Sequence, residues 1–283
     1  NIILNFAFIY AFPSLGVINL AMASSLVFFM MFITLAINVL QNEKLKVYGL
    51  LRDFKFFYPK LILKMLRLGV PMGMVFTFES GFFVLGTFMA GLFGPIPLAA
   101  HHIAIHLCIL TYMVIIGIAN ATSVMVSQAF GQAQFTRIRI IGRAGICLGF
   151  IWMSITSSFF ILWPEPLIYL FTYFNQQEMA SVFVIAAGLL MIGAVFQLFD
   201  GLQGIIFGIL RGLEEGFKPM LIAIIGYWCI GAPFAYLFAI HWQWGVKGVW
   251  WGLASGLAAT GLLGWMFFEW KIAKLRNTFT QQL

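Results

Sequence analysis

The stretch from Leu68 to Gly91 reads LGVPMGMVFTFESGFFVLGTFMAG and contains a single charged side chain, Glu79. A helix needs about 20 apolar residues to cross ~30 Å of hydrocarbon, so this run is long enough to span a membrane. A second apolar run, Met179 to Leu210, carries Asp200 as its only charge. A charge at mid-bilayer costs on the order of 2.5–3.5 kcal/mol, which makes both carboxylates candidate functional groups.

The composition of the whole chain is that of a membrane protein. Hydrophobic residues make up 62% of the 283 residues and charged residues only 9%, with a mean hydropathy of +0.99. These values lie well outside the range of soluble globular proteins. The apolar runs predict an all-α polytopic protein with seven complete spans. The spans are expected near residues 17–40, 68–91, 98–128, 144–163, 179–210, 220–240 and 249–270.

A shorter apolar run, Ile2 to Phe12, precedes the first complete span and has about half the length that a membrane helix needs. The chain opens on Asn1, and no charged segment or small-residue cleavage site comes before this run. These features favour the end of an incomplete membrane helix over a signal peptide. We therefore expect that the beginning of the protein is missing from the sequence.

The net charge of +7 does not indicate nucleic-acid binding, because the basic residues follow the predicted topology. When the loops are assigned alternately to the two sides of the membrane, only Lys247 of the 16 Lys and Arg residues falls on the sparsely charged side. The positive-inside rule then predicts a plasma (bacterial inner) membrane protein with the segment 41–67 and the C-terminus in the cytoplasm. The basic segment 41–67 could also lie along anionic lipid, with simple retention on that side as the alternative.

Glycine and proline positions predict how the helices pack. Two series of glycines at four-residue intervals should let neighbouring backbones approach closely. These series are Gly204, Gly208 and Gly212, and Gly248, Gly252 and Gly256. Pro233 falls inside a span and should kink it, whereas Pro71 is expected near a helix start, where proline is tolerated.

One face of the span from Leu98 carries a line of residues seven positions apart: His106, Met113, Asn120 and Ser127. At about 100° per residue these side chains project nearly together, so we expect the line to face a cavity. His106 could join a proton relay, and a hydrogen-bonded histidine at a helix contact is the alternative. His102 and His106 have the spacing of a zinc pair but enclose no catalytic Glu, so no metal site is predicted there.

A pair of carboxylates in the bundle suits ion exchange. Burial in low dielectric favours the neutral carboxyl until a proton, Na⁺ or cationic ligand changes its surroundings. One pair can neutralise a drug cation or a coupling ion, but binding both leaves excess positive charge. Exchange is the expected outcome, and the alternative for each acid is a permanently protonated interhelical hydrogen bond.

Dispersed motifs between Leu68 and Gly256 resemble those of the multidrug and toxic compound extrusion (MATE) transporters. The likeness rests on their order and spacing together. The motifs are Leu68-Gly69-Val70-Pro71 with Glu79 following, Ala99-Ala100-His101-His102-Ile103, Gly117-Ile118-Ala119-Asn120-Ala121, Gln128-Ala129-Phe130-Gly131, Gln197 with Asp200-Gly201-Leu202-Gln203-Gly204, and Leu210-Arg211-Gly212 with Pro219.

The resemblance implies a bundle of twelve helices in two lobes around a central cavity. On this mapping residues 1–40 are the last two helices of the first lobe, the first of them incomplete. Residues 41–67 are the basic linker between the lobes, and 68–270 are the complete second lobe of six helices. Residues 271–283 form a cytoplasmic tail.

The resemblance also implies exchange of organic, often cationic, drugs for H⁺ or Na⁺, without a cofactor, by a monomeric protein in membrane lipid. Glu79 and Asp200 match the acidic positions of the second lobe's cation site, and a Na⁺ ion could bind there. Gln197 and Gln203 lie one turn on either side of Asp200. Phe196 stands where some Na⁺-coupled relatives have Tyr. Its ring could offer only its face to a nearby cation, and simple packing is the alternative.

The residues that would recognise the exported compound are aromatic and acidic. Tyr112 could stack on an organic cation through its ring face, with buried packing as the alternative.

A flippase for lipid-linked precursors from the same superfamily is a second hypothesis for the function, but it should carry intramembrane Lys or Arg to hold phosphate. A non-transporting fragment is a third, because alternating access needs two halves. No motif of an intramembrane enzyme is found.

Overall fold

The computed structural model describes residues 2–12, 16, 18–42, 58–169 and 176–280. All regular secondary structure within these residues is helical, and seven of the helices are long and apolar enough to cross a membrane. This confirms the predicted all-α polytopic class and the number of spans. The chain divides into two units, Asn1–Ile62 and Leu63–Leu283, which are described separately.

The first unit contains α1 (Ile2–Ala11) and α2 (Ile18–Gln41). Asn19 near the start of α2 donates a hydrogen bond from its side-chain amide to the Phe12 carbonyl at 2.7 Å. This bond links the two helices across their short connection. Most side chains of α2 are exposed, as expected for a helix whose apolar surface faces lipid. Most of the segment 41–67 lies outside the described residues.

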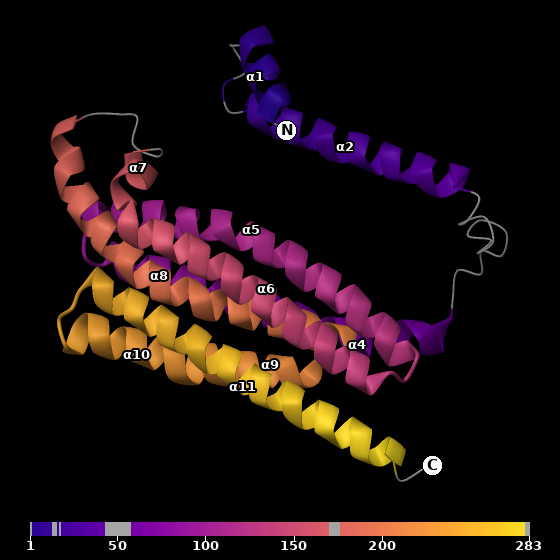
Figure 1. The fold of residues 1–283 in the computed structure, drawn as a ribbon. Coiled ribbons are helices and arrows are strands. Elements are labelled where there is room, and N and C mark those ends of the chain that lie inside the picture. Colours follow the sequence, from indigo (N-terminus) through magenta and orange to yellow (C-terminus); the bar gives the residue numbers. More distant parts are fainter. Residues whose placement is uncertain (1, 13–15, 17, 43–57, 170–175, 281–283) are drawn as a thin grey trace. The chain divides into compact units, whose positions relative to one another are not determined.

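The second unit contains the remaining helices, which run side by side along much of their length (Figure 1). The long ones are α4 (Pro59–Gly91), α5 (Pro95–Gly131), α6 (Phe135–Leu162), α8 (Gln176–Gly212) and α11 (Val246–Thr280), with the short α7 (Pro164–Tyr169) before α8. One further span consists of α9 (Phe217–Ala223), the π-helix η2 (Ile224–Gly231), α10 (Ala232–Tyr236) and the π-helix η3 (Leu237–His241).

Three helices extend well beyond the boundaries that the sequence predicts, and one of them, α6, begins at Phe135, before its expected start near residue 144. The helix α4 begins at Pro59, so residues 59–67, expected to belong to the linker, are already helical. Pro71 consequently lies inside α4, and its expected place near a helix start is wrong. The helix α11 continues to Thr280, through most of the expected tail. Apolar run length reports only the part of a helix inside the hydrocarbon, and charged turns can continue it into water.

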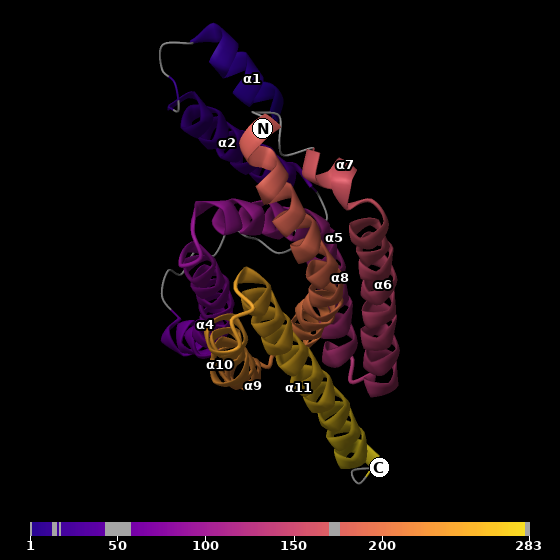
Figure 2. The same cartoon turned by 90° about the vertical axis from the view of Figure 1, so that its left-hand side faces the viewer.

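The helix α8 forms the most extensive contacts of the described helices, with α5, α11 and α6 (Figure 2). The glycines explain how close these contacts are. A Cβ atom added to Gly208 would lie 2.7 Å from the Ala119 carbonyl oxygen, and one added to Gly212 would lie 2.5 Å from the Ser123 carbonyl oxygen. The backbones of α5 and α8 therefore touch, as the four-residue glycine spacing predicts.

The second glycine series packs α11 against the span that contains Pro233. A Cβ atom on Gly252 would lie 2.2 Å from Cα of Ala235. The π-helical segments η2 and η3 flank α10, which carries Pro233 as its second residue. Proline supplies no backbone N–H, and the helical hydrogen-bond pattern changes from α to π on both sides of it. The predicted kink is expected where this pattern changes.

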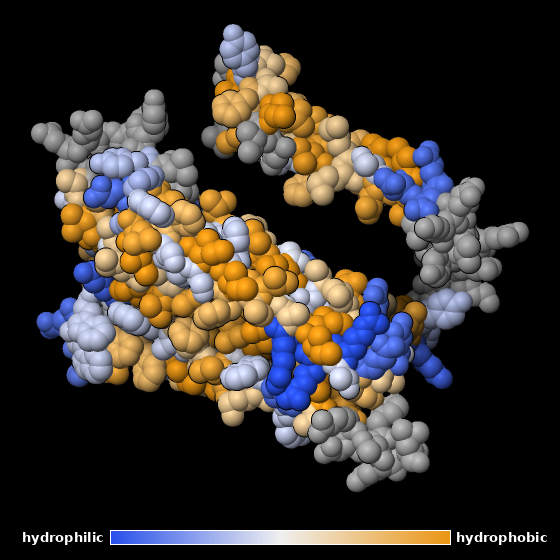
Figure 3. All heavy atoms as spheres, viewed as in Figure 1, coloured by the Kyte–Doolittle hydropathy of each residue, from blue (hydrophilic) through white to orange (hydrophobic). Residues whose placement is uncertain are grey.

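The helix α4 is held to the bundle by side chains. Phe82 is fully buried, and its ring fills the space left by Gly231 and Gly256. On the face of the second unit shown in Figure 3, hydrophobic side chains cover the middle and hydrophilic ones gather toward the ends. This distribution is the one expected of a bundle that crosses a bilayer.

Candidate binding cavity

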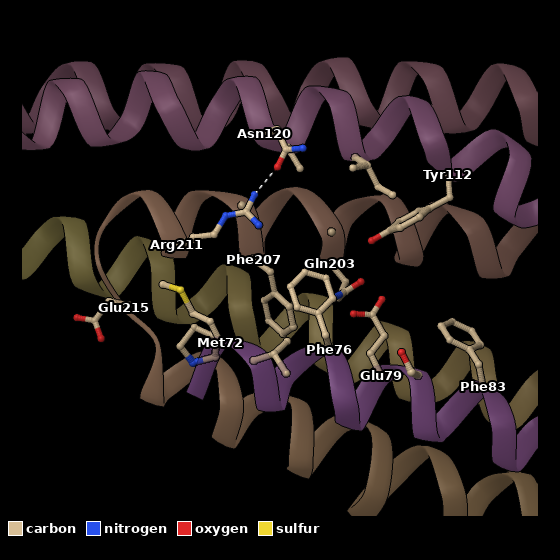
Figure 4. A pocket seen from close by; sticks show the side chains of 17 residues that line it. Met72, Phe76, Glu79, Phe83, Tyr112, Asn120, Gln203, Phe207, Arg211 and Glu215 are labelled. Atoms are coloured by element: carbon tan, nitrogen blue, oxygen red, sulfur yellow. Dashed lines mark hydrogen bonds between the residues drawn. The ribbon is translucent and has the colours of Figure 1, made fainter. Parts of the chain in front are cut away.

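A cavity of about 500 Å³ lies in the second unit, bounded by α4, α5 and α8. Its volume falls within the range of small-molecule sites, and most of its lining is apolar. Figure 4 shows the charged side chains Glu79, Arg211 and Glu215 distributed along it. The lining residues are Met72, Val75, Phe76, Glu79, Ser80, Phe83, Tyr112, Ile116, Ala119, Asn120, Gln203, Gly204, Phe207, Gly208, Arg211, Glu215 and Pro219.

Glu79 projects from α4 into this cavity. Its carboxyl group lies beside the side-chain amide of Gln203 from α8, and Phe76 and Phe83 flank it on its own helix (Figure 4). The side chain is half-buried, so it meets the contents of the cavity as well as the protein. A carboxylate among aromatic rings can bind an organic cation through charge and through the ring faces.

Asp200 lies behind the cavity wall. Its side chain is 5% exposed and does not line the cavity, yet it is close enough to Glu79 for the two carboxyl groups to interact electrostatically. Its Oδ1 atom is buried without a hydrogen-bond partner among the described residues. The two acids therefore belong to one polar region of the bundle, with Glu79 accessible from the cavity and Asp200 enclosed.

Two further buried oxygens accompany that of Asp200. Gln203 Oε1 and the Tyr227 hydroxyl have no hydrogen-bond partner among the described residues. Tyr227 is fully buried in η2 and lies within electrostatic range of both carboxyl groups. Buried polar groups are normally satisfied, so these three oxygens are free to accept a hydrogen bond or to contact a small cation. Tyr227 is not among the predicted site residues, because a tyrosine within an apolar span does not reveal which face it occupies.

Gln197 and Phe196 have contacts that account for them structurally. Gln197 accepts a hydrogen bond from Thr111 Oγ1 at 3.0 Å and donates one to Ser157 Oγ at 2.9 Å, which joins α8 to α5 and α6. Phe196 packs edge-on against Phe83 and also against Trp250. Neither residue lines the cavity, although both were predicted as supporting residues of the site.

Of the four residues in the predicted line on α5, only Asn120 lines the cavity. His106, Met113 and Ser127 are exposed elsewhere, and His106 Nδ1 lies 2.7 Å from the His102 carbonyl oxygen of its own helix. The other three side chains do not line this cavity, and that they face a cavity of a complete two-lobe protein stays a prediction.

The face of α5 that does line the cavity carries Tyr112, Ile116, Ala119 and Asn120. These positions follow the i, i+4, i+7, i+8 pattern of one side of a helix. Tyr112, a predicted supporting residue, has its ring at the cavity wall (Figure 4), and stacking on an organic cation stays a prediction.

Arg211 follows the predicted span 179–210 by one residue; it lies on the last turn of α8 and lines the cavity. Its Nη2 donates to Asn120 Oδ1 at 2.7 Å, and its Nε donates to Ser123 Oγ at 3.4 Å. Glu215 also lines the cavity and forms an ion pair with Lys271. The sequence held a signal for Arg211, because Gln203, Phe207 and Arg211 follow one another at four-residue intervals.

Comparison with known proteins identifies the family. The MatE family model matches residues 71–237, which is more than half of the chain and includes all of the cavity-lining residues. The chain belongs to the MatE family. Among MatE proteins of similar sequence are probable multidrug resistance proteins NorM from Pseudomonas aeruginosa and Pseudomonas putida. The first is 36% identical over 97% of this chain and 57% of the relative, and the second 33% identical over 97% and 60%.

Solved MatE structures show the same fold. A crystal structure of MATE in the straight conformation superimposes with a TM-score of 0.82 at 23% identity, covering 98% of this chain and 60% of that one. A multidrug resistance MATE family transporter of the MOP superfamily, in an outward-facing conformation, also gives 0.82 at 23% identity, over 97% and 61%. The chain thus spans about three fifths of the length of the relatives it matches.

Proposed function

We propose that this chain is the part of a cation-coupled antiporter that holds the coupling site and part of the drug-binding cavity. The exported compounds are organic, often cationic, and the coupling ion is H⁺ or Na⁺. One observation carries the proposal: Glu79 lines an apolar, aromatic cavity while Asp200 lies enclosed within electrostatic range of it. The names of the curated relatives, which describe multidrug resistance proteins, agree with it.

The two acids would bind different cations, Glu79 the exported compound and Asp200 the coupling ion. A cationic amphiphile would place its charge beside Glu79 and its apolar body against Phe76, Phe83 and Phe207. The coupling ion would occupy the enclosed oxygens, of which Asp200 Oδ1 has no other partner among the described residues. Because Glu79 and Asp200 interact, positive charge at one lowers the affinity for positive charge at the other, and this competition couples export to ion entry.

The proposed location is the plasma membrane, with the segment 41–67 and the C-terminus in the cytoplasm, as the distribution of basic residues favours. A monomer in membrane lipid, without nucleic acid, remains the expected state. The flippase alternative keeps one supporting feature. Arg211, in the last turn of α8, lines the cavity. A single guanidinium is nevertheless a poorer phosphate site than the basic cluster that this alternative requires.

The proposed function is tested in a two-lobe protein in which this chain replaces the matching part of the Pseudomonas aeruginosa relative. Everted vesicles from cells that produce it should accumulate ethidium when an H⁺ or Na⁺ gradient is imposed. Glu79→Gln and Asp200→Asn should each lower the ion-driven rate about tenfold or more, since each removes a charged partner from the site. Glu165→Gln, at an exposed position on α7, is the matched control and should keep the rate.

Full ion-driven transport by both site variants would refute the proposal. The 283-residue chain alone should not transport in reconstituted vesicles, because alternating access requires two halves to move around one site. Gradient-driven efflux by the chain alone would contradict this expectation.

A further inference from the structure

A charged cluster between α6 and α11 has no part in the proposed function. Arg139 donates from Nε and Nη2 to Glu269 Oε2 at 3.1 and 2.8 Å, and Arg143 donates from Nε to Oε1 of the same carboxylate at 3.1 Å. None of these three residues lines the cavity. Because two guanidiniums share one carboxylate, the cluster keeps a net charge of +1.

This charge is not neutralised by a second acidic side chain of the described residues. The acidic residues in the turn between α8 and α9 are bound by Lys64 and Lys271. The Nη1 atoms of Arg139 and Arg143 have no hydrogen-bond partner within the described part of the chain. The two side chains are 43% and 56% exposed, so each guanidinium can still donate to an anion that approaches from outside the bundle.

A neighbouring tryptophan indicates the depth of the cluster in the membrane. The helices α6 and α11 touch beside it, where a Cβ atom on Gly142 would lie 2.7 Å from Cζ of Phe268 (Figure 2). Trp270, the residue after Glu269, is 55% exposed and stacks on Phe267 with ring centroids 5.6 Å apart. Exposed tryptophans of membrane helices gather at the level of the lipid headgroups. The two arginines are therefore expected at the phosphates of one leaflet, on the side that the basic residues predict to be cytoplasmic.

Apolar side chains continue from the cluster toward the middle of the membrane. Cys147 and Ile151 follow Arg143 at four-residue intervals on α6, so they lie on the same face of that helix. Met266 precedes Glu269 by about one turn of α11, and Leu262 precedes Met266 by another. All four apolar side chains are exposed. A lipid with its phosphate at the arginines would lay an acyl chain along them.

We propose that Arg139 and Arg143 together bind the phosphate of an anionic phospholipid. The phosphodiester would accept hydrogen bonds from both guanidiniums, whose planar sets of N–H groups match phosphate oxygens. Basic sites at the cytoplasmic ends of membrane helices attract anionic headgroups. Phosphatidylcholine carries the same phosphate, but its choline brings a positive charge to a cluster that is already positive. The site is on the outer surface of α6 and α11, and it does not depend on the cavity or on transport.

Native mass spectrometry of the 283-residue chain in detergent measures the proposed lipid directly. Phosphatidylglycerol should saturate one site at about a tenfold lower concentration than phosphatidylcholine with the same acyl chains. Arg139→Gln and Arg143→Gln should each weaken phosphatidylglycerol binding about tenfold and leave phosphatidylcholine binding within about twofold. Arg143→Lys keeps the charge but not the planar donor set, and it should weaken binding less than Arg143→Gln does.

The matched control is Arg137→Gln. Arg137 is exposed in the same turn of α6, and its side chain bonds to Gln134. It precedes Arg139 by two residues and so projects from roughly the opposite side of the helix. Its replacement removes the same charge from the same leaflet and should leave the binding of both lipids within about twofold.

Glu269→Gln separates a lipid site from a purely structural ion cluster. It removes the negative charge that competes with the lipid and keeps both arginines, so phosphatidylglycerol binding should equal that of the parent or exceed it. Without lipid, Glu269→Gln and Arg143→Gln should both lower Tm, because each breaks ion pairs between α6 and α11. Added phosphatidylglycerol should then raise the Tm of Glu269→Gln and fail to raise that of Arg143→Gln.

Several results would overturn the proposal. If the arginine variants change both lipids equally or neither, or if Glu269→Gln loses phosphatidylglycerol, the cluster is only a link between α6 and α11. If Arg137→Gln weakens phosphatidylglycerol as much as Arg143→Gln does, general attraction to a basic surface explains the binding. Displacement of phosphatidylglycerol by inorganic phosphate would identify a site for free anions. None of these results bears on Glu79 and Asp200, so the proposed function is tested separately.

Discussion

The indole Nε1 of Trp250 on α11 donates a hydrogen bond to Nδ1 of His101 on α5 at 3.1 Å, with both rings buried. An indole can only donate, so Nδ1 must accept and the ring proton must reside on Nε2. That nitrogen lies 3.0 Å from Thr87 Oγ1 on α4, whose own proton goes to the Phe83 carbonyl. The imidazole is thus held neutral, and it joins three helices.

We predict that His101→Leu destabilises the protein, because it removes both bonds and leaves the Trp250 N–H buried and unpaired. The cost should be about 1–2 kcal/mol, as for other interhelical hydrogen bonds in membranes. Thermal unfolding in detergent should show a lower Tm than the parent. His102→Leu is the matched control at the next, exposed position and should leave Tm nearly unchanged. Equal Tm values for the two variants would contradict this role.

A second prediction concerns the contact between α5 and α8. Gly208→Ala places a methyl group 2.7 Å from the Ala119 carbonyl oxygen, so the two helices must separate. We expect a loss of about 1–3 kcal/mol, typical of overpacking, and a lower Tm. Because α5 and α8 both line the cavity, ethidium binding should weaken as well.

The control for the glycine is Gly117→Ala on α5, where an added Cβ would meet nothing within 4 Å. Alanine is the better helix former by about 1 kcal/mol, so this variant should keep or raise Tm. A Gly208→Ala variant as stable as Gly117→Ala would show that the backbones of α5 and α8 are less close than the structure places them.

The bilayer explains which parts of the fold the sequence could predict. It demands long apolar runs, and for that reason all seven spans were found. It places no such demand on helical turns outside the hydrocarbon, and so the start of α4 at Pro59 and the end of α11 at Thr280 were missed.

Site residues could be predicted from the sequence where a charged side chain in the membrane would be costly. They could not be predicted where the side of the helix on which a residue lies determines whether it reaches the cavity. Glu79 and Asp200 stood out because carboxylates are rare in such runs. Tyr227 and Arg211 did not, since a phenol is common in a span and an arginine at a helix end fits simple retention on one side of the membrane. Exposure of His106 could not be foreseen, because one helix does not reveal where its neighbours lie.

The two glutamines near Asp200 should separate folding from binding. The side chain of Gln197 forms hydrogen bonds with Thr111 and Ser157, so Gln197→Leu should lower Tm by an amount equivalent to about 1–2 kcal/mol. It does not line the cavity, and ethidium affinity at low temperature should stay within about twofold.

Gln203→Leu should show the reverse pattern. Its Oε1 has no hydrogen-bond partner among the described residues, and its only side-chain bond among them is to the Glu79 carboxyl, so Tm should fall less than in Gln197→Leu. It lies beside Glu79, and binding of the cationic dye ethidium should change. Anisotropy titrations and melting curves on both variants check the split, and an identical pattern for the two would refute it.

The last prediction concerns the hydroxyl of Tyr227. Thr260 lies close to it but directs its own hydrogen bond to the Gly256 carbonyl at 2.8 Å, and Tyr227 has no hydrogen-bond partner of normal geometry in the described chain. Its ring stacks on Phe82 with centroids 5.2 Å apart, a contact that phenylalanine preserves. Tyr227→Phe should therefore keep or slightly raise Tm, since a buried polar atom without a partner is removed.

If the Tyr227 hydroxyl helps to hold the coupling ion near Asp200, Tyr227→Phe should also raise the ion concentration needed for half-maximal efflux in the two-lobe protein by about tenfold. Tyr236→Phe, at an exposed position of the same span, should leave that concentration unchanged. An unaltered ion dependence in Tyr227→Phe would restrict the ion site to Asp200 and Gln203.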